Sequence, residues 1–200
     1  MITIAVFAFL ISLSIAYFSQ KYFIQKKLID HINSRSSHNV LATRNGGTSI
    51  FLTLFLISIY FYLNSEEVFD FSLIIPLGIL YTIGLYDDVY QVDFKLKFIF
   101  QIIVAKILVD LGIIIESLNG FMGIYEISYM VSQVLSIFFI VLIINAVNFT
   151  DGIDGLAITE IIKALAIIVL LSQSSVEFGI NFMIFIIMIC ILPLYLFNFK

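Results

Sequence analysis

Seven long apolar runs constrain what this chain can fold into more than any other feature of its sequence. They are, approximately, Ile2–Phe18, Thr48–Leu63, Phe71–Tyr86, Phe98–Ile115, Val131–Val147, Ile158–Leu171 and Phe178–Phe197. Only helices and closed barrels can cross a bilayer, because the hydrocarbon core offers no hydrogen-bond partners to an exposed backbone. Runs this long and continuous favour helices, so we expect an all-α fold, a polytopic bundle of about seven transmembrane helices.

The composition supports a membrane protein. Hydrophobic residues make up 62% of the 200 residues and charged residues 12%, whereas about a quarter of a soluble domain is charged. The first run has no basic n-region and no small-residue cleavage site, so we interpret it as a span rather than a signal peptide. Several runs are shorter than the roughly 20 residues of a full span. The sixth also contains Glu160 and Lys163, which can pair at i,i+3 or lie at the interface with the lysine snorkelling.

The charged residues predict which side of the membrane each connection faces. The first connection carries the basic residues Lys21, Lys26, Lys27, Arg35 and Arg44, the third carries Lys95 and Lys97, and the fifth is followed by Lys163. The even-numbered connections carry the acidic residues Glu66, Glu67, Asp70, Glu116, Glu126 and Glu177, and no Lys or Arg. The positive-inside rule therefore places the N-terminus outside and the odd-numbered connections in the cytoplasm. All polar motifs then lie on the cytoplasmic side, where we expect them to build one site.

A polar stretch at the end of the fifth run carries the strongest functional signal. Asn145, Asn148, Asp151 and Asp154 recur every three residues, so on a helix they would form one ribbon of oxygen atoms. Gly152 and Gly155, each directly after one of the aspartates, would let the backbone leave the helix and approach a ligand closely. Two amides and two carboxylates at the end of a membrane segment suit a hard cation and a polar substrate. The alternative is a simple polar helix cap, and the regular spacing of four such residues favours a site.

Two earlier cytoplasmic stretches could contribute to the same site. Asp87 and Asp88 repel each other unless a cation or a proton lies between them. On a helix they point about 100° apart, so both can face one metal only near a helix end; a solvated pair in a loop is the alternative. In the first connection Arg35 and Arg44 suit bidentate phosphate binding, and His38 could add a donor. An ordinary basic loop attracted to anionic lipid headgroups explains that connection equally well.

In these three stretches the chain resembles a known family, the polyprenyl-phosphate N-acetylhexosamine-1-phosphate transferases of glycosyltransferase family 4. These membrane enzymes, which include phospho-N-acetylmuramoyl-pentapeptide transferases, start cell-wall and surface-polysaccharide synthesis. The first cytoplasmic motif is matched by Asp30, Asn33, Arg35, His38, Arg44, Gly46 and Gly47. The aspartate-pair motif is matched by Gly84, Asp87, Asp88, Lys97 and Gln101. The third motif is matched by Asn145, Asn148, Asp151, Gly152, Asp154, Gly155, Leu156 and Ala157. The three blocks follow the family's order, and the resemblance covers essentially the whole chain.

The resemblance implies transfer of an N-acetylhexosamine-1-phosphate from a UDP-sugar to undecaprenyl or another polyprenyl phosphate, with release of UMP. It implies a Mg²⁺ cofactor, with Mn²⁺ as an alternative, because carboxylates can serve anionic substrates only with a cation between them. In this interpretation Asp87 and Asp88 are the catalytic pair and, with Asn148 and Asp151, the metal ligands. The substrate-binding residues that the resemblance implies are Arg35, His38, Arg44, Lys97, Asn148, Asp151 and Asp154.

The resemblance also implies partners and a location. We expect a UDP-N-acetylhexosamine, a polyprenyl phosphate lipid and the bilayer as partners, and no nucleic acid; a homodimer stays open. We expect a multi-pass protein of the inner (plasma) membrane with a cytoplasmic active site. The first loop lacks the Thr-Pro-Thr-Met-Gly-Gly run that is typical of the muramyl-pentapeptide enzymes. This favours an N-acetylglucosamine-1-phosphate or related amino-sugar transferase, as used to initiate O-antigen (lipopolysaccharide) or teichoic-acid synthesis.

Two departures from the family pattern qualify the expectation. The prolines that the family usually has near Ile32 and Thr43 are missing, and family chains carry further cytoplasmic motifs after the third. We therefore expect residues 1–200 to be a single transmembrane transferase domain, the N-terminal two thirds of a family-length chain, and to be inactive alone. One alternative is a truncated, inactive fragment that serves as a membrane or assembly component. The other is an ion-coupled transporter, which the clustering of carboxylates at helix ends disfavours.

Overall fold

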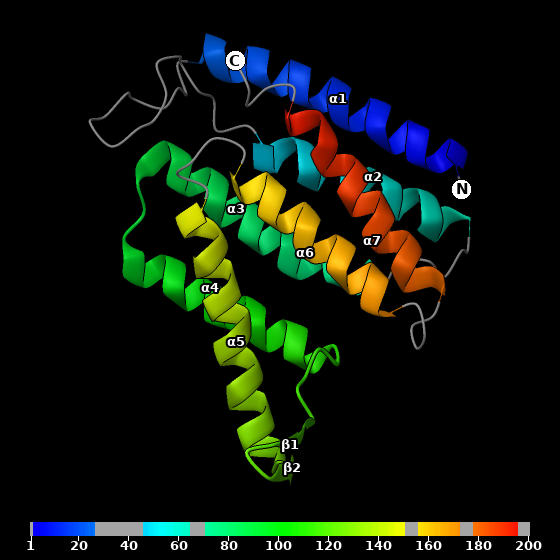
Figure 1. The fold of residues 1–200 in the computed structure, drawn as a ribbon. Helices are drawn as coiled ribbons and strands as arrows, with labels where there is room; N and C mark the ends of the chain where they lie inside the picture. The colour runs from blue at the N-terminus through cyan, green and yellow to red at the C-terminus, as the bar shows by residue number, and fades with distance from the viewer. Residues whose placement is uncertain (1, 27–45, 65–70, 151–155, 173–177, 196–200) are drawn as a thin grey trace. The chain divides into compact units, whose positions relative to one another are not determined.

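The expected helical bundle is what the chain forms. The computed structural model describes residues 2–26, 46–64, 71–150, 156–172 and 178–195. Within these ranges each of the seven apolar runs overlaps one α-helix (Figure 1). The helices are α1 (Ile2–Gln25), α2 (Gly46–Leu63), α3 (Ile74–Tyr90), α4 (Phe94–Asp110), α5 (Tyr129–Thr150), α6 (Leu156–Ser172) and α7 (Phe178–Ile191), with 3-10 turns at Phe71–Leu73 and Leu192–Leu194.

Three of these helices have the length of a membrane span, three are at its lower limit, and α7, with 14 residues, is shorter. Among the described residues, α1, α2 and α5 are long and apolar enough to cross one. Helices α3, α4 and α6 have 17 residues each, which is at the lower limit of about 17–25 residues for a spanning helix. The all-α membrane bundle expected from the sequence is therefore confirmed, with one addition.

The addition is a β-hairpin in the connection between α4 and α5, which the pattern of apolar runs does not predict. Strand β1 (Ser117–Phe121) pairs antiparallel with β2 (Ile124–Glu126), with Phe121 opposite Ile124. The two turn residues, Met122 and Gly123, both have positive φ angles, 53° and 78°. A two-residue turn of this kind matches the right-handed twist of the strands that it joins. Glycine adopts such angles at little cost, whereas methionine does so rarely.

The chain divides into two compact units. Unit 1 comprises Met1–Phe71 and Thr150–Lys200, and unit 2 comprises Ser72–Phe149. Unit 1 contains α1, α2, α6 and α7, which lie side by side (Figure 1). Unit 2 contains α3, α4, the hairpin and most of α5. That residues 1–200 act as a single transferase domain stays a prediction.

Small residues on α1 let the helices of unit 1 pack closely. Ala8, Ser12 and Ala16 follow one another at intervals of four and are fully buried, so they form one smooth face on which a neighbouring backbone can approach. The Ser12 hydroxyl donates a hydrogen bond of 2.6 Å to the backbone carbonyl of Cys190 on α7. A bulky residue at any of the three positions would push the helices apart.

The contacts in unit 1 show that its helices alternate in direction. The start of α2 lies against the end of α7, since a Cβ atom on Gly46 would be 3.6 Å from a methyl carbon of Leu194. Ala16 on α1, Ile158 at the start of α6 and Ile191 at the end of α7 belong to one buried cluster. The predicted cytoplasmic ends of these helices therefore lie at the same end of the unit, as the alternation of the connections requires.

Candidate functional site

The aspartate pair lies in the last turn of α3, and not in a loop. Helix α3 continues to Tyr90, and it ends because Gln91 adopts a left-handed conformation with φ 52° and ψ 73°. The backbone N–H of Gln91 donates to the carbonyl oxygen of Asp87 at 2.9 Å. The next N–H, that of Val92, donates to the Asp87 side chain, at Oδ1, also at 2.9 Å. Asp87 thus closes the helix end with both its backbone and its side chain.

A lysine on the next helix holds the Asp87 carboxylate. Lys97 is in the first turns of α4, and its Nζ lies 2.7 Å from Asp87 Oδ1. The Lys97 side chain is 35% exposed and that of Asp87 is 26% exposed. The pair is therefore partly shielded from water, which strengthens its attraction relative to a fully solvated pair. Asp88 is the next residue on the same helical turn and points about 100° away from Asp87.

The third motif is tied to the same helix α4. Asn145, near the end of α5, donates from Nδ2 to Oε1 of Gln101 at 2.8 Å and to the carbonyl oxygen of Val141 at 2.8 Å. Gln101 is 8% exposed and lies one turn after Lys97 on the same face of α4. Asn148 follows one turn after Asn145 and is exposed on α5. Lys97 and Gln101 of the second motif thus connect α4 with both α3 and α5.

The structure therefore places some of the predicted site residues and not others. Asp87, Asp88, Lys97 and Asn148 are described, and all four belong to unit 2. The predicted residues Arg35, His38, Arg44, Asp151 and Asp154 lie outside the described residues. Asp87 and Lys97 are brought into direct contact. That the described and the remaining residues build one site stays a prediction.

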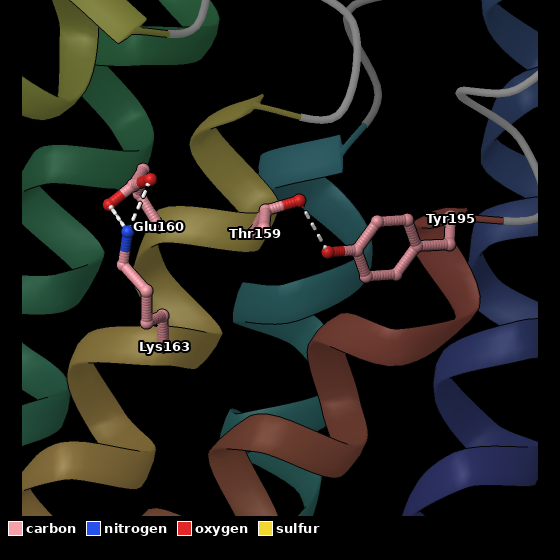
Figure 2. Close-up of polar contacts among 4 residues, drawn as sticks. All are labelled: Thr159, Glu160, Lys163 and Tyr195. Carbon is pink, nitrogen blue, oxygen red and sulfur yellow. Dashed lines mark hydrogen bonds and ion pairs between the residues drawn. The ribbon is translucent and has the colours of Figure 1, made fainter.

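Two further polar contacts near helix ends were also not anticipated from the sequence. One is the hydrogen bond between Gln101 and Asn145, whose two members match family motifs but had no assigned partner. Each of the two is a polar residue within an apolar helix and lies one helical turn from a candidate site residue. That placement is the sequence signal that could have indicated their contact. The other joins Thr159, at the start of α6, with the hydroxyl of Tyr195 just after α7, at 2.8 Å (Figure 2).

The pairing of Glu160 with Lys163 at the start of α6 was anticipated and is confirmed. Lys163 Nζ lies 2.6 Å from the Glu160 carboxylate (Figure 2). Both side chains are about half exposed, at 45% for Glu160 and 58% for Lys163. Lys163 is thus paired within its own helix, α6. We therefore assign this ion pair a structural role at this end of unit 1.

The donor atoms at the end of unit 2 are of the type that a hard divalent cation takes. Asp87, Asp88 and Asn148 offer carboxylate and amide oxygens, which are the ligands of Mg²⁺ and Mn²⁺. In the described part of the chain no three acidic, histidine or cysteine side chains gather closely enough to hold a metal by themselves. The oxygen atoms of these three residues are of the kind that such an ion binds, and they supply part of its ligand set.

Comparison with known proteins gives a consistent picture. The family model described as Glycosyl transferase family 4 matches residues 70–200, which is well over half of the chain. A relative in Yersinia pestis, "Undecaprenyl-phosphate alpha-N-acetylglucosaminyl 1-phosphate transferase", is 28% identical over 78% of this chain and 43% of its own length. "Decaprenyl-phosphate N-acetylglucosaminephosphotransferase" of Mycolicibacterium smegmatis is 38% identical over 49% of this chain and 25% of its own length.

A third relative aligns with nearly the whole chain. "Phospho-N-acetylmuramoyl-pentapeptide-transferase" of Streptococcus equi is 23% identical over 98% of this chain and 66% of its own length. The matches to the first two relatives span less than half of those proteins.

Proposed function

This chain belongs to glycosyl transferase family 4, and on that premise we propose that its protein transfers an N-acetylhexosamine-1-phosphate to a polyprenyl phosphate. A phosphate oxygen of the lipid attacks the β-phosphorus of a UDP-sugar, and the bond from that phosphorus to the bridging oxygen breaks. UMP leaves with that oxygen, and the product is a lipid diphosphate-linked sugar. The observation that carries the proposal is the aspartate pair at the end of α3, with Asp87 held by Lys97 of α4.

The arrangement suits phosphoryl transfer because it fixes charges in place before the substrates arrive. An ammonium group has three N–H donors, so Lys97 can contact Asp87 and still donate to a phosphate oxygen. Asp87 in turn is anchored by the N–H of Val92 and by Lys97. Groups held in this way need little reorganisation when charge develops on the transferring phosphoryl group. Most of the rate enhancement would come from such positioning and charge neutralisation.

Asp87, Asp88, Asn148 and Asp151 would hold a Mg²⁺ or Mn²⁺ ion. Such an ion supplies positive charge that neutralises the diphosphate of the donor. Lys97 would contribute a further positive charge on the α4 side of the pair. Asp87 is paired with Lys97, and Asp88 would be a candidate to receive a proton from the attacking lipid phosphate. Arg35, His38 and Arg44 would bind substrate phosphates, and Asp154 would bind the uridine.

The names of the relatives support N-acetylglucosamine as the transferred sugar. The Yersinia pestis and Mycolicibacterium smegmatis proteins both carry this sugar in their names. The Streptococcus equi protein, at lower identity, is named for a muramyl-pentapeptide. We therefore propose UDP-N-acetylglucosamine as the donor and a place at the start of lipopolysaccharide or another cell-envelope polysaccharide. The site would face the cytoplasm, where nucleotide sugars are made.

Substitution of the aspartates tests the function directly. The assay follows UMP and lipid-linked sugar formed from UDP-N-acetylglucosamine and undecaprenyl phosphate, with the protein expressed from its gene and kept in its membranes. Asp87→Asn and Asp88→Asn should each lower the rate by about 100-fold or more if the pair stabilises transition-state charge. Removal of divalent ions with EDTA should abolish the reaction, and Mg²⁺ should restore it.

Asp93→Asn is the matched control. Asp93 is exposed at the start of α4, where its backbone carbonyl accepts hydrogen bonds and its side chain makes no cap hydrogen bond. This variant should keep a rate within about threefold of the parent. Full activity in EDTA, or in either variant of the pair, would show that the aspartates are not the centre of the reaction.

A further inference from the structure

We propose that the hydrogen bond between Gln101 and Asn145 is a positioning device that sets α5 at one height along α4, and so places Asn148 beside Lys97 and Asp87. This inference rests on the proposed function for its catalytic consequence. Its structural part concerns unit 2 alone. Gln101 and Asn145 would be positioning residues and would not themselves touch the substrates.

The hydrogen bond is well defined in both partners. Val141 offers only a carbonyl acceptor to Asn145, so the Asn145 amide must present its NH₂ group there. The same NH₂ group then donates to Gln101, which must present its oxygen. The amide orientations of both side chains are thus determined by a backbone carbonyl. Because Gln101 is buried, loss of its partner would leave a polar atom without water to replace it.

The direction of the helices decides which residues the hydrogen bond brings level. Gln101, near the start of α4, contacts Asn145, near the end of α5. Ile115, just beyond the end of α4, contacts Ser136, nearer the start of α5, where its N–H donates to the hydroxyl at 2.8 Å. The two helices therefore run antiparallel.

Because the helices are antiparallel, residues before Gln101 on α4 lie level with residues after Asn145 on α5. From Gln101 toward the start of α4, Lys97 lies one turn away, a rise of about 6 Å. In the same direction along α5, Asn148 lies about 4.5 Å beyond Asn145. Lys97 and Asn148 are thus at nearly the same height, on the faces that Gln101 and Asn145 share. A slip of α5 by one residue would move Asn148 by about 1.5 Å relative to the Asp87–Lys97 pair.

The rest of the junction between α4 and α5 explains why such a bond is needed. The other polar contacts between these segments, those of Ile115 with Ser132 and Ser136, lie beyond the end of α4 and toward the start of α5. Helices α4 and α5 approach each other at few points, so an interhelical hydrogen bond, one of the forces that associate helices in lipid, carries much of their alignment. The hydrogen bond at Gln101 therefore fixes the two helices at the end where the candidate site lies.

Gln101→Leu tests the proposal, because leucine fills a similar volume and cannot accept the hydrogen bond. In the transfer assay, kcat per folded enzyme should fall by about 10- to 100-fold, the loss expected from a misplacement of about 1 Å. KM for the UDP-sugar should stay within about threefold, since the groups that bind it remain. Asn145→Leu should have the same effect. The double variant should be no slower than the slower single variant, because both substitutions remove the same hydrogen bond.

Ser136→Ala is the matched control, because it removes a polar contact at the other end of the same junction. It should leave kcat per folded enzyme unchanged. An equal loss of kcat in this variant would show that any weakening of the junction slows the enzyme, and would overturn a special role for Gln101. Losses that multiply in the double variant would mean that Gln101 and Asn145 act separately, and would overturn the proposal as well.

A second measurement reads the position of α5 without any activity. In a Cys190→Ser background, cysteines replace Lys97 and Asn148 and are joined with a short bismaleimide. Adding Gln101→Leu should lower the cross-linking yield by about threefold or more if the helices slip by about one residue, and adding Ser136→Ala should not. An unchanged yield with Gln101→Leu overturns the proposal. If the unmodified protein forms no lipid-linked sugar, the proposed function fails, and the cross-linking yield still decides the role of the hydrogen bond.

Discussion

At the scale of single residues, the site depends on how each charge is compensated. Asp87 is paired with Lys97 across two helices and is only about a quarter exposed. Glu160 and Lys163 make a pair of similar length on one helix, and both are more exposed. A partly buried carboxylate that loses its partner costs more than an exposed one, because less water can replace the lost charge. The two ion pairs should therefore respond differently to substitution.

Lys97→Met is the residue-scale prediction. It removes the charge that holds Asp87 while keeping the length of the side chain, so we expect transfer to slow by about 100-fold or more, the loss typical of one electrostatic contact. Lys97→Arg keeps the charge in a different shape and should lose less. Lys95→Met is the control, because Lys95 is exposed two residues away, on the opposite side of α4. Equal losses in Lys95→Met and Lys97→Met would indicate a general effect of net charge.

At the scale of elements, the sequence was sufficient for the helices and insufficient for their contacts. The seven apolar runs predict all seven helices of the described part, because hydrophobicity over a span is a local property. The Asp87–Lys97 and Gln101–Asn145 contacts depend on how two helices are rotated and how far they slide. No local pattern encodes that. The hairpin was missed because it is short and because Met122–Gly123 differs from the usual Asn-Gly turn.

The prediction at this scale concerns the attachment of α5. Ser136 is buried and its hydroxyl accepts the N–H of Ile115. Ser136→Ala leaves that N–H without an acceptor, so the free energy of unfolding should fall by about 1–3 kcal/mol. Thermal unfolding in detergent would measure the change.

Ser14→Ala is the comparison for this measurement. The Ser14 hydroxyl donates to Leu10 within its own helix and is exposed. Its loss should change stability by less than about 0.5 kcal/mol, as for most substitutions away from buried features. Equal effects of the two serine variants would mean that the contact between Ile115 and Ser136 contributes nothing specific.

At the scale of the whole molecule, the distribution of charge predicts the orientation, and the packing within each unit shows how its helices alternate. The contacts of Gly46 with Leu194 and of Thr159 with Tyr195 show that helix ends meet within unit 1 as alternating spans require. The contact of Gln101 with Asn145 shows the same within unit 2. The packing is the same whichever side faces the cytoplasm. Only the positive-inside rule assigns the side, from Lys95 and Lys97 among others.

Labelling of single cysteines tests that assignment. In a Cys190→Ser background, Met122→Cys would lie at the tip of the hairpin, where Met122 is 84% exposed. We expect this cysteine to react in intact cells with a thiol reagent that does not cross membranes. Asp93→Cys, exposed between α3 and α4, should react only after the cells are opened, because the positive-inside rule places that connection in the cytoplasm. The opposite result would put the aspartate pair outside the cell, away from cytoplasmic nucleotide sugars, and the proposed transfer reaction would lose its substrate.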